Sequence, residues 1–390
     1  MDFKLIDGKK IKDKKVIVRL DLNSPDADNM HYRFLATKET ITFLMKNKAK
    51  TIIVLAHLGR PEGDKHSIKI NNFDYYNEKL SLKIFKGILS KLYKTKIFFL
   101  KYSIFDERFL KYFKAKKFPK IILLENIRFY KGEDNNDLEF IKKIANVGDI
   151  FVDEGFSVCH RQVASNSAIT KILPSYYGFN YMNEIKNLDK IIEKSLGNLA
   201  VIIGGAKIKD KSELLFKFIK HTKCVLIGGG IANTFIKNMG FEIGKSYYDE
   251  GVMTNAAKLN FANVILPMDF KVLENKGAVK NKLSSDIDVG DKILDIGNLT
   301  TRQFIDKIKL NKYVFWNGPL GYIEDERFST STRAVLEFIK NDKQRKYVIG
   351  GGETLDCISK YQPSIFKQAN VFVSTGGGAM LWYLSKKIKN

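Results

Sequence analysis

The chain has 390 residues, of which 44% are hydrophobic and 12% aromatic, and its formal net charge is +23. This composition excludes an intrinsically disordered chain, and the length is typical of two domains of about 150–200 residues each. No apolar run approaches the roughly 18 residues of a membrane helix. Residues 1–15 are polar and rich in lysine, unlike a signal peptide. We therefore expect a cytoplasmic protein without a membrane partner.

Cysteine and histidine usage argues against a disulfide framework and against structural zinc. The three cysteines, Cys159, Cys224 and Cys357, are odd in number and far apart, as expected of reduced thiols. The five histidines are scattered, without metal-ligand spacing to the cysteines. We expect no structural zinc site.

The basic charge allows two interpretations. A strong excess of lysine and arginine is typical of proteins that bind nucleic acid or another polyanion. Here, however, only 10 of the 66 basic residues are arginine, and the lysines are spread almost evenly along the chain. That distribution is typical of a codon-driven drift in composition, so we expect no specific nucleic-acid partner and keep polyanion binding as an alternative.

Short apolar runs alternate with longer amphipathic segments along the whole chain. In the first half the expected strands are Val16–Leu20, Thr51–Ala56, Ile97–Leu100, Ile121–Leu124 and Asp149–Val152. In the second half they are Leu199–Ile203, Cys224–Ile227, Asn263–Leu266, Tyr313–Trp316, Lys346–Ile349 and Asn370–Ser374. Continuous apolar runs indicate strands buried on both faces of parallel sheets, connected by right-handed crossovers. The pattern predicts an α/β protein with two doubly wound, Rossmann-like parallel-sheet domains.

A domain boundary is expected near Pro174. Residues 181–195 have the periodicity of an amphipathic helix, which Gly197 would close. We expect an N-terminal domain over residues 1–174, an inter-domain hinge helix within 175–198 and a C-terminal domain over 199–390.

Polar clusters follow the apolar strands of the first half. They contain a set of basic residues: Arg33, His57, Arg60, Arg128, His160 and Arg161. Because parallel strands end at one edge of a sheet, these side chains are expected to meet there. Like charges placed together are costly unless an anion fills the site. The set therefore predicts a small, multiply charged metabolite as ligand.

Glycine runs follow four strands of the second half: Gly204-Gly205, Gly228–Gly230, Gly350–Gly352 and Gly376–Gly378. A strand that ends in glycines and leads into a helix exposes backbone N–H groups that bind phosphate. One such turn is ordinary turn chemistry, whereas four indicate a phosphorylated ligand. Neither a Walker loop nor a G-x-G-x-x-G fingerprint is present, which argues against a dinucleotide-binding domain.

Three segments of the second half add polar groups near these glycines. Gly204–Lys211 places lysines where a phosphate chain would lie, and Trp316–Glu324 ends in a carboxylate suited to a ribose or a metal-bound water. Glu353 and Thr354 follow a triple glycine and would suit Mg²⁺ beside the phosphates.

Taken together, these motifs resemble the phosphoglycerate kinase family from about Asp2 to about Leu384. The matching blocks are RxDxNxP, HLGRP, LENxRFxKGE, GGGIANTF, NGPxG and STGGGA, in the family's order and spacing. The resemblance implies a glycolytic kinase that transfers phosphoryl reversibly between 1,3-bisphosphoglycerate and ADP, giving 3-phosphoglycerate and ATP. It implies a monomer that binds the acid substrate on the N-terminal domain and Mg²⁺-nucleotide on the other, with in-line transfer after hinge closure.

The resemblance also implies site residues. For the acid substrate they are Asp21, Leu22, Asn23, Arg33, His57, Leu58, Gly59, Arg60, Arg128, His160 and Arg161. For the nucleotide they are Gly205, Lys207, Lys211, Asn317, Glu324, Gly351, Gly352, Glu353 and Thr354, with Glu353 also on the metal. The catalytic set is Arg33, Lys211, Gly376, Gly377 and Gly378. Because the acceptor is a carboxylate with a pKa of about 4, no general base is expected.

The chain departs from the family pattern in four places. The loop between Pro25 and Arg33 is about three residues short, and residues 153–159 read DEGFSVC, with Val163 where a histidine is often found. Glu353 replaces the usual aspartate, and the chain ends at Asn390, before the family's C-terminal helical tail. These differences leave a degenerate relative with weak turnover as an alternative to an active enzyme.

Overall fold

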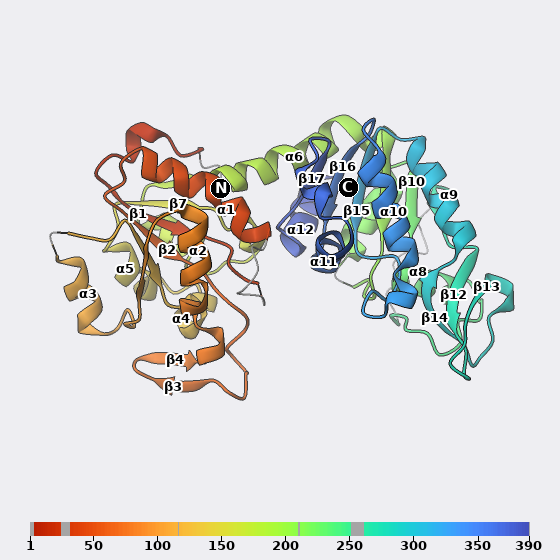
Figure 1. The fold of residues 1–390 in the computed structure, drawn as a ribbon, viewed down its shortest axis with the longest axis horizontal. Helices are drawn as coiled ribbons and strands as arrows, with labels where there is room; N and C mark the ends of the chain where they lie inside the picture. Colours follow the sequence, from red (N-terminus) through yellow and green to blue (C-terminus); the bar gives the residue numbers. More distant parts are fainter. Residues whose placement is uncertain (1–3, 25–31, 116, 210, 251–260, 390) are drawn as a thin grey trace. The chain divides into compact units, whose positions relative to one another are not determined.

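Alternating strands and helices build each half of the chain around one parallel sheet. The structure, a computed structural model, describes residues 4–24, 32–115, 117–209, 211–250 and 261–389. It divides into a first unit, Met1–Ile185, and a second unit, Lys186–Asn390. The division lies inside helix α6 (Phe179–Ser195), shown in light green in Figure 1.

The first unit has a six-stranded sheet in the order β5-β6-β2-β1-β7-β8, with every neighbouring pair parallel. The strands are β1 (Lys15–Arg19), β2 (Thr51–Leu55), β5 (Ile97–Leu100), β6 (Ile121–Leu124), β7 (Ile150–Asp153) and β8 (Ser175–Tyr177). A small antiparallel hairpin, β3 (Ile68–Ile70) with β4 (Phe73–Tyr76), projects from this unit.

Helices cover both faces of this sheet. Helices α1 (Tyr32–Lys46) and α2 (Lys86–Tyr93) pack on one face, where Val16 and Val18 of β1 point. Helices α3 (Glu107–Phe113) and α5 (Leu138–Ala145) pack on the other face with Ile17. This alternation along β1 explains its continuous apolar run, because both faces are buried. The remaining helical pieces are α4 (Lys131–Asp134), η1 (Gly8–Lys10), η2 (Glu78–Leu80), η3 (Leu82–Phe85), η4 (Ile127–Phe129), η5 (Phe156–Val158) and η6 (Ala168–Lys171).

The start of α6 is anchored to the first unit. The Glu154 carboxylate, just after β7, accepts hydrogen bonds from the N–H groups of Asn180 (3.1 Å) and Tyr181 (3.0 Å). The hydroxyl of Thr40 on α1 donates to the same carboxylate. Burial raises the pKa of Glu154 to about 7, although these hydrogen bonds oppose the shift. Residues 153–159, which depart from the family pattern, therefore include a helix cap.

The second unit repeats the plan with the order β11-β10-β9-β15-β16-β17, again entirely parallel. The strands are β9 (Leu199–Ile203), β10 (Cys224–Ile227), β11 (Val264–Ile265), β15 (Tyr313–Asn317), β16 (Lys346–Gly350) and β17 (Val371–Val373). Strand order reverses between β9 and β15, and ligands of doubly wound sheets bind at the carboxyl ends of such strands.

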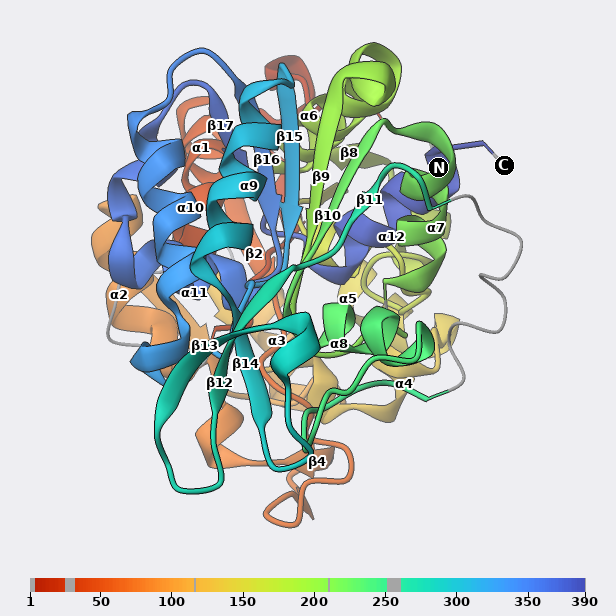
Figure 2. The ribbon, with the colours of Figure 1, turned by 90° about the vertical axis from the view of Figure 1, so that its right-hand side faces the viewer.

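Figure 2 shows helices on both faces of this second sheet. Helices α9 (Asn298–Lys309), α10 (Thr330–Asn341) and α11 (Gly352–Tyr361) share one apolar core with the strands. The other face carries α7 (Ser212–His221), α8 (Gly229–Asn238) and α12 (Gly378–Lys387), and Phe218 of α7 packs on Phe315 of β15. Short turns are η7 (Leu196–Asn198), η9 (Ser284–Asp286), η10 (Glu326–Phe328) and η11 (Pro363–Lys367).

A second, antiparallel sheet of the second unit was not expected. It has the order β13-β12-β14, from β12 (Asp269–Leu273), β13 (Val279–Leu283) and β14 (Lys292–Ile296). In β12, Phe270 and Val272 are buried while Lys271 between them is not. Such one-sided strands alternate in polarity and lack a continuous apolar run.

The α/β class with two doubly wound parallel sheets is confirmed, and a strand lies at each of the expected positions. The three cysteines are unpaired. Within the described residues, no helix has both the length and the apolar character needed to cross a bilayer.

Candidate functional site

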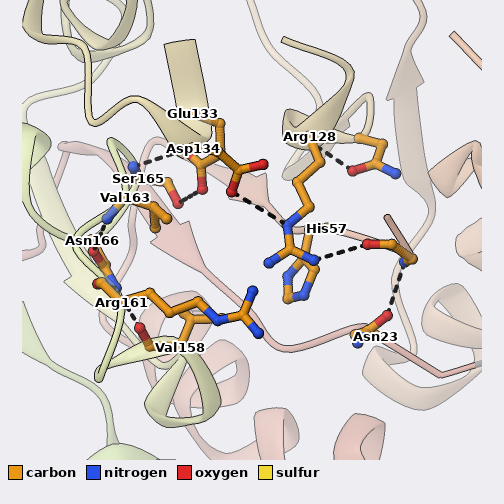
Figure 3. A network of polar contacts seen from close by, with 12 residues as sticks. Asn23, His57, Arg128, Glu133, Asp134, Val158, Arg161, Val163, Ser165 and Asn166 are labelled. Carbon is orange, nitrogen blue, oxygen red and sulfur yellow. Dashed lines mark hydrogen bonds and ion pairs between the residues drawn. The ribbon is translucent and has the colours of Figure 1, made fainter. Parts of the chain in front are cut away.

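The basic residues of the first unit gather at the carboxyl ends of its strands. Arg33 lies in the first turn of α1, His57 follows β2, Arg128 lies in η4 after β6, and Arg161 follows η5 after β7. With His160 they form what we call the basic site. Figure 3 shows Asn23, His57, Arg128 and Arg161 in this region, with the hydrogen bonds and ion pairs among the residues drawn.

Arg33 is held by a carboxylate of the first strand's loop. Its Nη1 lies 2.6 Å from Asp21 Oδ2, and Asp21 Oδ1 accepts from the N–H of Asn23 at 3.1 Å. Burial alone would lower the pKa of Arg33, but attraction to Asp21 outweighs it and raises the pKa above its ordinary value. The charge of Arg33 is thus partly compensated within the protein, contrary to the expectation of an uncompensated basic set.

Asn23 and Arg128 meet at Gly59. Gly59 donates its N–H to Asn23 Oδ1 at 2.9 Å, and its carbonyl accepts from Arg128 Nη1 at 2.8 Å. Arg128 is buried, and burial lowers its pKa to about 10, while Asp134 opposes the shift. It remains a cation at neutral pH. These bonds join the loops after β1, β2 and β6 into one surface.

Three residues expected to bind the acid substrate differ from the others in burial: two lie in the apolar core and one is exposed. Leu22 and Leu58 are buried in the apolar core, and both backbone polar groups of Leu58 are hydrogen-bonded to Asn126. Arg60 is exposed to solvent. Leu22 and Leu58 therefore shape the loops instead of offering side chains to a ligand.

His160 and Arg161 form the fourth loop of the basic site. Arg161 Nε donates to His160 Nε2 at 3.4 Å, and the amide of Asn166 fixes the Arg161 carbonyl at 3.0 Å. Burial and the neighbouring Arg161 lower the pKa of His160, so it is neutral at pH 7. His160 Nδ1 is buried and has no partner among the described residues.

The second unit contains two adjoining cavities with Ala206 and Glu353 in both walls. The first, of about 170 Å³, is mainly apolar. Its wall includes Gly229, Gly230, Asn233, Phe270, Ile293, Leu320 and Glu324. The second, of about 450 Å³, has two lysines and further polar side chains in its wall, and we call it the polar cavity. Its wall includes Lys207, Lys211, Asn317, Gly351, Gly352, Thr354, Gly377 and Gly378.

Two helices begin at the polar cavity. Neither α11, which starts at Gly352, nor α12, which starts at Gly378, has a side-chain cap among the described residues. Their first N–H groups can therefore bind an anion, which the helix dipole favours. The N–H of Gly376 instead donates to Ser374 Oγ at 3.1 Å, and Gly376 does not line the cavity.

The side chain of Lys211, in the wall of the polar cavity, lies beside Gly205 and Gly318. Its Nζ donates to the Gly204 carbonyl at 2.7 Å. Gly205 and Gly318 have φ angles of +89° and +91°, which disfavour any other residue. A Cβ on Gly318 would lie 2.2 Å from the Gly204 carbonyl oxygen and 2.6 Å from Lys211 Nζ. The position of the lysine therefore depends on glycine at 318.

Two further polar groups of the polar cavity differ in whether they already have a hydrogen-bond partner. Asn317 Nδ2 is buried without a hydrogen-bond partner in the described part of the chain, so an acceptor entering the polar cavity would satisfy it. The Thr354 hydroxyl already accepts from the N–H of Gly318 at 2.9 Å.

A divalent cation would find one carboxylate in the polar cavity, that of Glu353. No group of three or more acidic, histidine or cysteine residues suited to a metal occurs among the described residues. Mg²⁺ is commonly held by one or two carboxylates together with phosphate oxygens and water, so the residues present fit a cation that arrives with a phosphate ligand.

The short loop between Pro25 and Arg33 lies outside the described residues.

The set of site residues expected from the sequence did not include several residues of both sites. Arg19 and Asn126 are buried and organise the basic site, but their partners are far away in sequence. Phe270 and Ile293 of the apolar cavity lie on the unexpected antiparallel sheet. The alternation of Phe270, Lys271 and Val272 in β12 was the available local signal.

Comparison with known proteins identifies the family of the chain. The family model described as phosphoglycerate kinase matches residues 6–387. The chain is 36% identical over 385 residues to the phosphoglycerate kinase of Wigglesworthia glossinidia brevipalpis, covering 97% of this chain and 92% of the relative. It is 35% identical over 399 residues to that of Coprothermobacter proteolyticus, covering 100% and 97%. The solved phosphoglycerate kinase of Coxiella burnetii superposes with a TM-score of 0.79 at 28% identity, covering 99% and 97%. The chain belongs to the phosphoglycerate kinase family.

Proposed function

We propose that the basic site of the first unit binds the acid substrate and that the two cavities of the second unit bind the nucleotide. The chain is a glycolytic phosphotransferase: it moves a phosphoryl group reversibly between 1,3-bisphosphoglycerate and ADP, giving 3-phosphoglycerate and ATP. The proposal assigns the binding of each substrate to particular residues.

The observation that carries the proposal is the adjoining pair of cavities. An apolar cavity beside a polar one matches a nucleotide, which has an apolar base at one end and phosphates at the other. Glu324 in the apolar wall suits the ribose hydroxyls. Lys207, Lys211 and the starts of α11 and α12 suit the phosphates.

The first unit offers the complementary chemistry for the acid substrate. Arg33, Arg128 and Arg161 present guanidinium groups, which bind carboxylate and phosphate through paired N–H donors. Asp21 and Asn23 help to hold these groups in place, as described above. Arg60, although exposed, would add a fourth guanidinium for an anion that extends toward solvent.

The transfer needs no proton acceptor on the protein, because the attacking carboxylate is already ionised at neutral pH. It needs neutralisation of the charge on the transferred phosphoryl group and in-line placement of the two oxygens. Lys211, Arg33 and the N–H groups at Gly377 and Gly378 are suited to that neutralisation. Gly376 would serve indirectly, by shaping the turn before α12. Because each substrate would lie on its own unit, the units must bring their ligands together, in a movement about α6.

Mg²⁺ would be held in the polar cavity by Glu353 together with the nucleotide phosphates. When bound, it supplies positive charge to the phosphate oxygens. We further propose that the chain works as a monomer in the cytoplasm, since one chain supplies both sets of residues.

The deciding experiment is a coupled assay for ATP formation from 1,3-bisphosphoglycerate and ADP, run with the wild-type chain and with Arg33→Ala and Lys211→Ala. An active wild type with both variants impaired supports the assigned roles. A wild type that binds both substrates but turns over weakly would identify the degenerate alternative. Full activity in either variant would contradict the role given to that residue.

A further inference from the structure

Arg19, at the end of β1, borders the basic site but has none of the roles assigned above. It is 1% exposed, and its guanidinium group makes three hydrogen bonds. Nε donates to Ser165 Oγ at 2.8 Å and Nη1 to the Leu20 carbonyl at 2.6 Å. Nη2 lies 2.9 Å from Nδ1 of His57. A buried arginine thus touches a histidine of the proposed substrate site.

The chemistry of this contact determines which nitrogen of His57 carries the proton. A guanidinium group has only donors, so the imidazole nitrogen facing it must be the acceptor. A proton on Nδ1, in the imidazolium or in the other neutral tautomer, would place two N–H groups against each other. His57 is therefore neutral with its proton on Nε2.

The surroundings of His57 favour the same state. Burial lowers its pKa well below the ordinary value, and the positive charges of Arg19, Arg128, Arg161 and Arg33 lower it further. Protonation of His57 would place a fifth positive charge beside four arginines, which is unfavourable until an anion is bound.

Arg19 is itself held in place from a third segment. Ser165 Oγ, which accepts from Arg19, donates to Glu133 Oε1 at 2.6 Å, and the Ser165 N–H donates to Glu133 Oε2 at 3.0 Å. Figure 3 shows this Glu133–Ser165 pair. The buried Glu133 carboxylate also attracts Arg19 electrostatically. The orientation of Arg19 is thus fixed on the side away from His57.

We propose that Arg19 is a positioning residue for the acid substrate, because it holds His57 as a neutral hydrogen-bond donor through Nε2. The inference rests on the proposed role of the first unit. Among the described residues, none accepts a hydrogen bond from His57 Nε2, which leaves this N–H for an oxygen of the substrate. The basic site thereby gains a directed donor without another charge.

A double-mutant cycle tests whether Arg19 acts through His57. Calorimetry with 3-phosphoglycerate compares the wild type, Arg19→Met, His57→Gln and the double variant. Arg19→Met should weaken binding about tenfold in the wild type and less than about twofold in the His57→Gln background, since coupled residues are non-additive. Arg345→Met is the matched control, because Arg345 is a part-buried arginine of the second unit that bonds two carbonyls and Asp342. It should leave 3-phosphoglycerate affinity unchanged.

Nitrogen NMR of the imidazole rings supplies a second readout, which does not depend on substrate affinity. The chain has five histidines, and loss of one set of signals in His57→Gln assigns the ring. In the wild type, Nδ1 of His57 should remain unprotonated from about pH 5 to pH 8, across the ordinary histidine pKa of about 6.5.

The outcomes separate this inference from the proposed function. Non-additive losses with an unprotonated Nδ1 support it. A His57 that titrates near its ordinary pKa, a proton on Nδ1, or additive losses would overturn it while leaving the substrate site in place. Unchanged 3-phosphoglycerate affinity in His57→Gln would instead contradict the assignment of His57 to that site, and this inference with it.

Discussion

The two proposed ligand sites use different parts of the polypeptide. The basic site of the first unit is made of charged side chains held by one another across loops, as in the pairs Arg33–Asp21 and Arg128–Gly59. The polar cavity of the second unit is made largely of glycine backbone and the uncapped starts of α11 and α12. Both sites lie at the carboxyl ends of parallel strands. An anion would meet charged side chains in the basic site and main-chain N–H groups in the polar cavity.

The two sites therefore differ in which substitutions would damage them. In the basic site a substitution removes one donor and leaves its buried partner unpaired. In the polar cavity the N–H groups cannot be substituted, so function depends on the shape of the turns and on the few side chains that reach over them. The predictions that follow test this contrast.

The largest effect is expected for Lys211→Ala. Removing a preorganised positive charge from the polar cavity should lower kcat by a factor of about 10²–10³. Affinity for 3-phosphoglycerate should hardly change, because that ligand is assigned to the first unit. Steady-state kinetics and calorimetry measure the two quantities. Lys209→Ala, an exposed lysine two residues away, is the control and should keep the wild-type rate. A wild-type kcat in Lys211→Ala would remove the lysine from the mechanism.

The converse test is in the basic site. Arg33→Ala and His57→Ala should each weaken binding of the acid substrate by about tenfold or more, since hydrogen bonds to charged groups are strong. Arg33→Ala should also lower kcat, and both variants should bind ADP normally. Calorimetry with each ligand separates these effects. Loss of ADP affinity with intact 3-phosphoglycerate binding would mean that the two units had been assigned the wrong way round.

Two glycine substitutions test the backbone half of the comparison. Gly318→Ala should cost about 1–3 kcal/mol of unfolding free energy, because φ is positive there and the new Cβ would meet a carbonyl oxygen. It should also lower kcat by displacing Lys211. Gly87→Ala should do neither, because Gly87 lies in α2, away from both sites, and a Cβ there would meet no atom within 4 Å. Denaturant unfolding and the coupled assay report both. Equal effects of the two substitutions would show that turn shape is not what matters.

The smallest effect is expected for Glu353→Asp. Mg²⁺ requires near-ideal octahedral geometry, and a longer side chain holds it less well than aspartate would. Glu353→Asp should therefore raise kcat or lower the half-saturating Mg²⁺ concentration by a few-fold, whereas Glu353→Ala should lose activity. A Mg²⁺ titration of the rate decides between the possibilities. A slower Asp variant with a higher Mg²⁺ requirement would mean that the surrounding backbone has adapted to glutamate.

Sequence patterns predicted the parallel sheets well for a physical reason. Strands such as β1, β9 and β10 are buried on both faces, so each is an uninterrupted apolar run. Strand β12 alternates only around Lys271, which lies between the buried Phe270 and Val272, and β13 is polar and mostly exposed, so neither strand has a continuous apolar run. The parallel strands found by pattern carry the loops of both sites, whereas the missed sheet carries part of the apolar cavity.

Within the sites, sequence patterns identified the groups but not their partners. Basic residues and glycines are visible by residue type, and Arg33, Arg128 and Lys211 lie where strand ends gather. The contact between Arg19 and His57, 38 residues apart, depends on the pairing of β1 with β2. The contact of Arg19 with Ser165 spans 146 residues. Long-range contacts of this kind follow from topology and have no local signature.

The assignment of one substrate to each unit is tested most directly by hydrogen exchange of the whole chain, followed by mass spectrometry with each ligand alone. We predict that 3-phosphoglycerate protects peptides around residues 20–24, 57–60, 126–129 and 158–161. We predict that ADP with Mg²⁺ protects peptides around residues 204–211, 317–324 and 350–354. Protection of the first unit's loops by ADP, or of the second unit's glycine turns by 3-phosphoglycerate, would contradict the account.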